Sequence, residues 1–325
     1  DYTRASEFVA NTEGAFNSGT VPAAIEGYEK LLARDTVDAV YIPLPTARRA
    51  EWAIKAAEAG KHVYVEKPAA VNAAQVVEMQ EAAAANNVVI MDGTMFPHSL
   101  RMQQMRTAID DELGNIRSMS GDFHFHGGPD FLSSGNIRLD PSLEPDGCLG
   151  DLQWYTQRFF LWAMNFQRPL RVSGRATRKH NDVPIEFRSR VEYPGSVFAD
   201  SYSSFGTQFS QPMRVTGEKA RLHLDDFVLP RQGQQTHFVV QTDEYTDDDP
   251  TNVRVVEKTD RRTVQEWHSH HKTAQHVRLI TAFCAYARGV EAIDWGRQTL
   301  MTMQILDALR ESAAHNGEPV EVEQE

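Results

Sequence analysis

The first third of the chain alternates between short β-branched runs and longer amphipathic segments, and this alternation limits the possible folds most strongly. Residues 38–43, 62–65 and 88–91 have strand character, whereas residues 3–11, 27–34, 46–59 and 72–85 have helical periodicity. We expect Thr46 to cap the third of these helices and Asn72, with Gln75 three residues later, to cap the fourth. Right-handed crossovers would place the carboxyl ends of all the strands on one edge. The pattern predicts a doubly wound parallel sheet that binds its ligand along that edge.

After about residue 97 the pattern becomes that of an α+β domain. A helix with Leu100, Met105 and Ile109 on its buried side leads into a strand over residues 116–125. A loop over residues 127–147 and a helix over residues 149–165 follow. Further strand-like runs cover residues 170–177, 185–193, 197–205, 213–216 and 221–224. They predict a large open, mostly antiparallel sheet, with residues 243–262 as a solvated excursion and two closing helices. We therefore expect two domains, at residues 1–95 and 96–325.

Composition narrows the class of function. The chain has 33 Lys and Arg residues against 45 Asp and Glu residues, a formal net charge of −12. Such an acidic balance disfavours nucleic acids and anionic membranes as partners. No apolar run approaches a membrane span, and the two cysteines are too few for a disulfide framework. We expect a cytoplasmic globular protein, and any targeting region would precede Asp1.

The tripeptide Glu66-Lys67-Pro68 stands at the end of a predicted parallel strand, where doubly wound sheets place their chemistry. Further along the chain, Asp151 and Tyr155 are four residues apart, a spacing that puts both on one face of a helix. Asp151 and Tyr155 could therefore point together into a cleft between the domains. A tyrosine placed next to a lysine ammonium would have a lowered pKa and could exchange protons with a substrate oxygen. Alternatively, Tyr155 is a core residue and Asp151 a first-turn residue that stabilises the helix dipole.

The segment AGKHV-x-x-EKP at residues 59–68, with the later Asp151 and Tyr155, resembles the Gfo/Idh/MocA family of nicotinamide-dependent oxidoreductases. The resemblance implies a Rossmann-type domain that binds NAD or NADP. It also implies hydride transfer between the nicotinamide and a hydroxyl or carbonyl group of a sugar, polyol or related small diol. Tyr155, where histidine is commoner, is similar to the glucose–fructose oxidoreductase and dihydrodiol dehydrogenase branches. An open sheet face further predicts a homodimer or homotetramer.

The resemblance also suggests roles for individual residues. Lys67 and Tyr155 would handle the proton, and Asp151 would orient the substrate. The expected cofactor-binding residues are Pro45, Thr46, Arg49, Glu66, Lys67 and Pro68. The expected substrate-binding residues are Arg101, His124 and Trp154. For three of them a structural alternative stays open: a surface position for Arg49, a surface salt bridge for Arg101 and cross-strand packing for His124.

Two departures from the family pattern stand out. No two glycines in the chain stand in a G-x-G relation, so the phosphate-binding fingerprint is absent. We interpret the chain as N-terminally truncated, lacking the first βαβ portion of its Rossmann-type domain, so that it could be inactive alone. The second departure is Gln153, where relatives commonly have glycine, and we expect its side chain to alter the substrate pocket.

Two other classes of function are possible. A non-catalytic sugar-binding or scaffold protein could keep the fold and lose the dinucleotide site. A metal-dependent hydrolase would need a site at His268, His270 and His271, but no HExxH arrangement accompanies them. We therefore expect no metal site.

Overall fold

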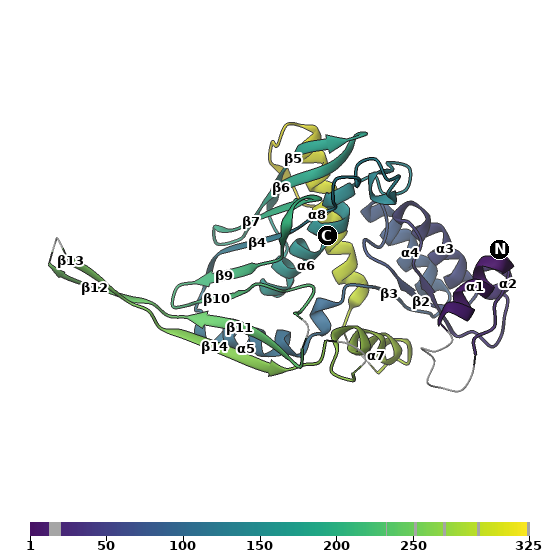
Figure 1. The fold of residues 1–325 in the computed structure, drawn as a ribbon, viewed down its shortest axis with the longest axis horizontal. Coiled ribbons are helices and arrows are strands. Elements are labelled where there is room, and N and C mark those ends of the chain that lie inside the picture. Colours follow the sequence, from purple (N-terminus) through teal and green to yellow (C-terminus); the bar gives the residue numbers. More distant parts are fainter. Residues whose placement is uncertain (13–20, 232, 250–251, 269–270, 291–292, 324–325) are drawn as a thin grey trace.

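Three parallel strands form a small sheet near the start of the chain (Figure 1). Their spatial order is β1 (Ala39–Ile42), β2 (His62–Val65) and β3 (Ile90–Asp92). The computed structural model describes residues 1–12, 21–231, 233–249, 252–268, 271–290 and 293–323. Helices α3 (Thr46–Glu58) and α4 (Ala73–Ala85) connect the strands, and α1 (Tyr2–Thr12) and α2 (Tyr28–Leu32) precede them. This arrangement confirms the parallel sheet of the first third.

The expected capping groups form at α4 but not at α3. Asn72 Oδ1 accepts a hydrogen bond from the backbone N–H of Gln75 at 2.9 Å, as the sequence predicts. Thr46 is already inside α3, and its side chain does not cap the helix. Its backbone N–H donates instead to Oε1 of Glu144 at 2.9 Å, so a carboxylate far along the chain satisfies the N-terminus.

A ten-stranded sheet forms the larger part of the molecule. In spatial order its strands are β14 (Thr259–Gln265), β11 (Gln235–Gln241), β10 (Arg221–Leu224), β9 (Met213–Gly217), β4 (Ile116–His126), β7 (Val197–Ser204), β6 (Val183–Tyr193), β5 (Arg171–His180) and β15 (Val320–Glu321), with β8 (Gly206–Ser210) also beside β4. The pair β4 and β7 is parallel and the other pairs are antiparallel. The expected large, mostly antiparallel sheet is thus confirmed.

Residues 243–262 form a solvated excursion as expected, with Tyr245 and Val255 exposed, but the segment is mostly strand. Strands β12 (Glu244–Asp249) and β13 (Asn252–Val256) form a hairpin that projects from the sheet (Figure 1), and β14 returns beside β11. The sequence analysis also missed β11. In that strand Thr236, Phe238 and Val240 alternate inward and are buried, a period-two pattern interrupted by polar residues.

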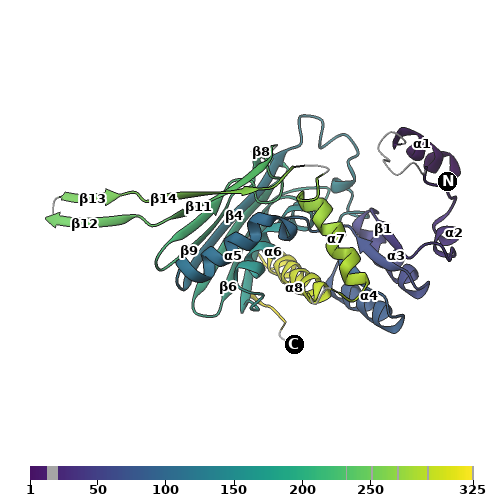
Figure 2. The ribbon, with the colours of Figure 1, turned by 90° about the horizontal axis from the view of Figure 1, so that it is seen from below.

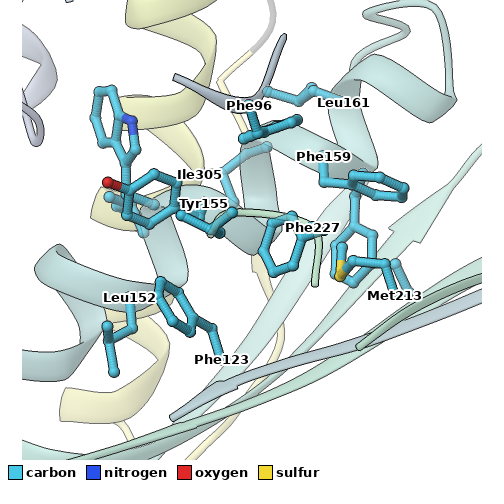
Figure 3. Packing of buried hydrophobic residues seen from close by; sticks show 14 of the residues in the cluster. Phe96, Phe123, Leu152, Tyr155, Phe159, Leu161, Met213, Phe227 and Ile305 are labelled. Atoms are coloured by element: carbon cyan, nitrogen blue, oxygen red, sulfur yellow. The ribbon is translucent and has the colours of Figure 1, made fainter. Parts of the chain in front are cut away.

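Helices cover one face of the large sheet and leave the other face open (Figure 2). They are α5 (Leu100–Glu112), α6 (Trp154–Ala163) and α8 (Trp295–Ala314), whereas α7 (Gln275–Ala287) packs through Leu279 and Phe283 against Met91 of β3. Short turns η2 (Phe96–His98), η3 (Ile137–Leu139) and the π-helical η4 (Leu149–Gln153) complete the chain. One apolar core continues from the parallel sheet under α6 and α8 to the large sheet. Phe96, Phe123 and Phe227 in this core lie around α6 (Figure 3). No helix of the described residues is long and apolar enough to span a membrane.

Candidate active site

The side chain of Lys67 joins the parallel sheet to the turn η4. Lys67 follows β2 at the carboxyl edge of the parallel sheet, and its Nζ lies 2.6 Å from Oδ1 of Asp151 in η4. The same Nζ donates to the backbone oxygen of Asp151 at 2.8 Å. Two segments that are far apart in the sequence therefore meet at a charged contact, at the edge where doubly wound sheets bind ligands.

Tyr155 completes this group. Lys67 Nζ lies 4.6 Å from the centroid of the Tyr155 ring, and Phe123 of β4 packs edge-on against the same ring (Figure 3). The regular α-helix expected through Asp151 and Tyr155 is interrupted, because Asp151 lies in the π-helical turn and Tyr155 in the first turn of α6. Both side chains nevertheless reach Lys67. Single π-helical turns inside helices are frequent at functional sites.

Asp151 and Lys67 stabilise each other's charged forms. Burial would raise the pKa of Asp151, but the nearby Lys67 and Arg138 lower it to about 2. Arg138 Nε donates to Oδ2 of Asp151 at 2.8 Å, so both carboxylate oxygens are engaged. Burial opposes the charge of Lys67, yet Asp151 and Tyr155 hold its pKa above the usual value. Both members of the pair are charged at neutral pH.

The pKa of Tyr155 shifts in the direction opposite to the prediction. Burial raises the pKa of its phenol, and although Lys67 lowers it, the carboxylates of Asp151 and Glu66 raise it further. The net shift of the pKa is upward, so the expectation of a lowered pKa was wrong although Lys67 acts in the expected direction. The reason is that desolvation of the buried phenolate outweighs the attraction of one ammonium that is itself paired with a carboxylate. Tyr155 keeps its proton at neutral pH.

The predicted cofactor residues gather at the carboxyl edge of the parallel sheet. Arg49 Nη1 donates to Thr46 Oγ1 at 2.8 Å and to the backbone oxygen of Pro68 at 2.5 Å, and its Nε donates to the oxygen of Leu44 at 2.7 Å. Arg49 is only 7% exposed, so the surface position considered for it is wrong. Its guanidinium fastens the start of α3, next to Pro45, to the segment after β2.

Glu66 lies on the other side of the same edge. Its Oε1 accepts from the Tyr41 hydroxyl at 2.7 Å, and its Oε2 accepts from the backbone N–H of Lys67 at 3.2 Å. A Cβ added at Gly93, after β3, would lie 3.3 Å from Oε2 of Glu66 and 3.1 Å from the Tyr64 hydroxyl. The ends of all three strands are therefore closely spaced here.

None of the three expected substrate residues lies free beside Lys67. Trp154 is fully buried, and its Nε1 donates to Thr94 Oγ1 at 2.7 Å. Arg101 is also fully buried and forms an ion pair with Asp226, so neither the cleft nor a surface salt bridge describes it. These two side chains connect parts of the core.

His124 points away from the candidate site. It lies on β4 next to Phe123, whose ring faces Tyr155, and successive strand residues point to opposite faces. On the open face of the sheet it contacts Tyr202, and its Nδ1 lies 2.5 Å from the backbone oxygen of Gln208. The expectation that His124 faces the cleft is therefore wrong, and the packing alternative describes its place.

Two charged residues of the loop over residues 127–147 were missed by the sequence analysis. Arg138 reaches Asp151, and Glu144 accepts from both the N–H and the Oγ1 of Thr46. No local pattern marks either residue, because both contacts depend on the path of a long loop across the edge of another sheet. The irregular length of that loop was the available signal, since long loops frequently carry function.

Gln153 has a different environment from the one expected. It is fully buried, and its Oε1 accepts hydrogen bonds from Ser189 at 3.0 Å and Ser201 at 2.7 Å, on β6 and β7. The side chain fastens η4 to the large sheet and does not enter the neighbourhood of Lys67. The structure thus gives Gln153 a packing role, and its effect on the substrate pocket stays a prediction.

The histidine cluster gives no metal geometry. His271 Nδ1 lies 2.9 Å from Thr273 Oγ1, and His270 lies outside the described residues. Within the ranges that the structure describes, no three His, Cys, Asp or Glu side chains are placed to hold a metal ion.

Three family models match successive parts of the chain. Residues 3–94 match the NAD-binding Rossmann fold of an oxidoreductase family. Residues 102–223 match the GFO/IDH/MocA C-terminal domain, and residues 181–322 match the C-terminal alpha/beta domain of the oxidoreductase family.

Individual relatives agree with these models. D-xylose 1-dehydrogenase (NADP(+)) 2 of Haloferax volcanii is 30% identical over 93% of this chain and 86% of the relative. The dTDP-3,4-didehydro-2,6-dideoxy-alpha-D-glucose 3-reductase of Streptomyces violaceoruber is 36% identical over 50% of this chain and 45% of that reductase. Among solved structures, the 3-ketoreductase KijD10 of Actinomadura kijaniata, in complex with NADP and TDP-benzene, has a TM-score of 0.79 at 24% identity and covers 96% of this chain and 87% of its own. The chain belongs to the Gfo/Idh/MocA family of oxidoreductases.

Proposed function

We propose that this chain works as an NAD(P)-dependent oxidoreductase that transfers hydride between nicotinamide and a hydroxyl or carbonyl group of a sugar, polyol or related small diol. The observation that carries the proposal is the convergence of Lys67, Asp151 and Tyr155 at the carboxyl edge of the parallel sheet. The names of the relatives, which are dehydrogenases and reductases of sugars and diols, support the same substrate class.

The residues at the sheet edge fit the nicotinamide end of the cofactor. Backbone at the ends of β1, β2 and β3 comes close together there, and Gly93 has no side chain to fill the space beside Glu66. Pro45, Thr46 and the segment Glu66-Lys67-Pro68 would line this end. The chain has no G-x-G loop, so we assign none of its residues to the pyrophosphate. NAD or NADP, when bound, supplies or accepts the hydride.

The three central side chains would then handle the proton and the charge on the substrate oxygen. Tyr155 is protonated, so in the reducing direction it donates its phenolic proton to the carbonyl oxygen that becomes a hydroxyl. The Lys67 ammonium stabilises the negative charge that develops on this oxygen. In the oxidising direction the proton returns to Tyr155 as the hydride leaves.

Asp151 would act as a positioning residue. Lys67 and Arg138 already engage both of its carboxylate oxygens, so it has less capacity to orient a substrate than the sequence suggested. By pairing with Lys67 it keeps the amine charged and directs it over the ring of Tyr155.

Three further expectations, on domain division, oligomeric state and cellular location, remain proposals. We keep the division into domains at residues 1–95 and 96–325. A homodimer or homotetramer is supported by the open face of the large sheet (Figure 2). A cytoplasmic location is supported by the two unpaired cysteines, Cys148 and Cys284.

The test uses the full gene product, with whatever residues its gene places before Asp1. NADH and NADPH binding is followed by fluorescence, and aldoses, polyols and their ketones are screened by nicotinamide absorbance. We expect turnover in the wild type and large losses in Lys67→Ala and Tyr155→Phe with cofactor binding retained. Cofactor binding without turnover of any substrate, or full turnover in both variants, would contradict the proposal.

A further inference from the structure

One side of the Arg138 guanidinium is unused. Its Nε donates to Asp151, while Nη1 and Nη2 form no hydrogen bond to any other residue that the structure describes. The side chain is 42% exposed, although Asp151 is only 16% exposed. Arg138 therefore extends from a buried carboxylate toward solvent, with the outer pair of N–H donors free.

Two cations meet at the Asp151 carboxylate. Lys67 and Arg138 both pair with this carboxylate, so two cations share one anion. Glu66 lies close to Lys67, and the carboxylate of Glu144 adds to that of Asp151 in raising the pKa of Arg138. Arg138 is the more exposed of the two cations, at 42% against 11% for Lys67.

Arg138 is held in place before any ligand arrives. It lies in the turn η3, where its backbone N–H donates to Oδ1 of Asn136 at 3.0 Å, and the next residue, Leu139, is buried. Further along the same loop, the oxygen of Leu143 accepts from the N–H of Ala47 at 3.0 Å. The loop is thus fastened to the start of α3. A donor that is fixed in advance loses little conformational freedom when it binds.

We propose that the free edge of Arg138 binds an oxyanion of the substrate, a carboxylate or a phosphate carried by the sugar. Two parallel N–H groups match the two oxygens of such a group, and the positive charge of the guanidinium favours it over a neutral hydroxyl. The inference deepens the proposed function, on which it rests, because the anionic group would lie on the far side of Asp151 from Lys67 and thereby fix which carbon faces Tyr155.

The test compares acids with their neutral counterparts by calorimetry, which needs no turnover. The pairs are D-glucuronate with D-glucose, D-galacturonate with D-galactose, and D-glucose 6-phosphate with D-glucose. We expect at least one acid to bind the wild-type full gene product about 10-fold or more tightly than its counterpart, since charge-assisted hydrogen bonds have this strength. Equal affinity in every pair, or no detectable binding of any acid, would overturn the proposal. The carboxylate and phosphate pairs show which oxyanion is preferred.

Arg138→Gln should abolish the preference for the acid, and Arg138→Lys, which keeps the charge without the fork, should restore part of it. Arg190→Gln is the matched control, because Arg190 pairs with Asp200 on the open face of the sheet and its loss changes the net charge equally. The control should keep the full preference. A preference that persists in Arg138→Gln would overturn the proposal.

Two further measurements separate the possible causes. NADH and NADPH are titrated into Arg138→Gln and Arg190→Gln, and a loss of cofactor affinity as large as the loss of acid affinity would place the oxyanion on the cofactor and overturn the inference. An Arg138-dependent acid preference without any turnover would support this subsite and contradict the oxidoreductase function. Turnover of neutral sugars without any acid preference would support the oxidoreductase function and contradict this subsite.

Discussion

Lys67 and Asp151, 84 positions apart in the sequence, form an ion pair in which Nζ and Oδ1 are 2.6 Å apart. The pair connects the edge of the parallel sheet to the turn that begins α6, and through α6 to Tyr155. A charged amine therefore lies over the ring of a phenol that keeps its proton. This arrangement suits proton donation to a carbonyl oxygen better than proton abstraction at neutral pH.

Replacing Tyr155 by phenylalanine removes the proposed proton donor and keeps the packed ring. We expect kcat for carbonyl reduction to fall by about 10²- to 10⁴-fold, the usual contribution of a positioned acid. Steady-state kinetics with NADPH measure the loss. Tyr202→Phe is the matched control, because the Tyr202 hydroxyl bonds only to Thr207 among the described residues and lies on the open face of the sheet. Equal rates in the two variants would contradict the assignment.

The rate of reduction should depend on pH through the same group. Because burial raises the pKa of Tyr155, its phenol stays protonated beyond the ordinary value, and the rate should fall only above about pH 10. The pH profile of kcat/KM in the reducing direction measures this limb. A descending limb near neutral pH that disappears in Tyr155→Phe would show a lowered pKa instead and would reject the protonated form.

The parallel sheet could be predicted because its signals are local. Its strands are compact β-branched runs, and Asn72 with Gln75 marks the start of α4 within four residues of sequence. The convergence of Lys67 with Asp151 and Tyr155 was expected from the resemblance to the family's motifs. The spacing of four residues added only that Asp151 and Tyr155 could share one face of a helix.

The unpredicted features depend on contacts between distant segments. Glu144 occupies the N-terminus of α3, and Arg138 reaches Asp151, only because a long loop crosses the sheet edge. Successive residues of β4 point to opposite faces of the sheet, so the face of His124 depends on which of them point to the core. The sequence does not settle this, because both faces carry mixed polar and apolar residues. The upward pKa shift of Tyr155 could not be predicted, because it depends on how deeply the phenol is buried. No pattern of residue types indicates that depth.

Asp151 should make stability depend on pH in the acid range. Its folded pKa is lowered from 3.8 to about 2, so the stabilisation is fully present above the unfolded value of 3.8 and is lost as the pH falls through about 2. The shift corresponds to about 2 kcal/mol. Urea unfolding should therefore show a gap between wild type and Asp151→Asn that shrinks over this range. Asp200→Asn, at an exposed ion pair, should change stability by less than about 1 kcal/mol at any pH. A gap that stays constant with pH would show that the carboxylate charge is not the cause.

Arg49→Ala should destabilise the protein far more than Arg48→Ala, although both residues lie in the first turn of α3. Arg49 is buried and bonds the oxygens of Leu44 and Pro68, which its removal would leave without a partner. We expect a loss of about 2 to 4 kcal/mol. Arg48 is 64% exposed, and its removal should cost less than about 0.5 kcal/mol. Urea unfolding of both variants is the measurement, and similar losses would contradict the structural role of Arg49.

Replacing the Asp92 carboxylate should destabilise the contact between the parallel sheet and the helices more than replacing any other carboxylate there. It follows Met91 at the end of β3, and its Oδ2 accepts from Arg158 Nη2 at 3.0 Å and from Thr299 Oγ1 at 2.5 Å. The ion pair is 1% and 2% exposed on its two sides, so Asp92→Asn would leave a buried guanidinium without its counter-charge. We expect a loss of about 3 to 5 kcal/mol of stability.

The same substitution should also slow catalysis, because Arg158 lies in α6 one turn after Tyr155 and the ion pair holds that helix against β3. Unfolding by urea and kcat at a temperature where the variant remains folded are measured together. Asp110→Asn provides the comparison, since Asp110 pairs with Arg106 at a position that is 51% exposed, and it should change neither quantity appreciably. If Asp92→Asn lost stability while kcat kept its wild-type value, the ion pair would support the fold without positioning Tyr155.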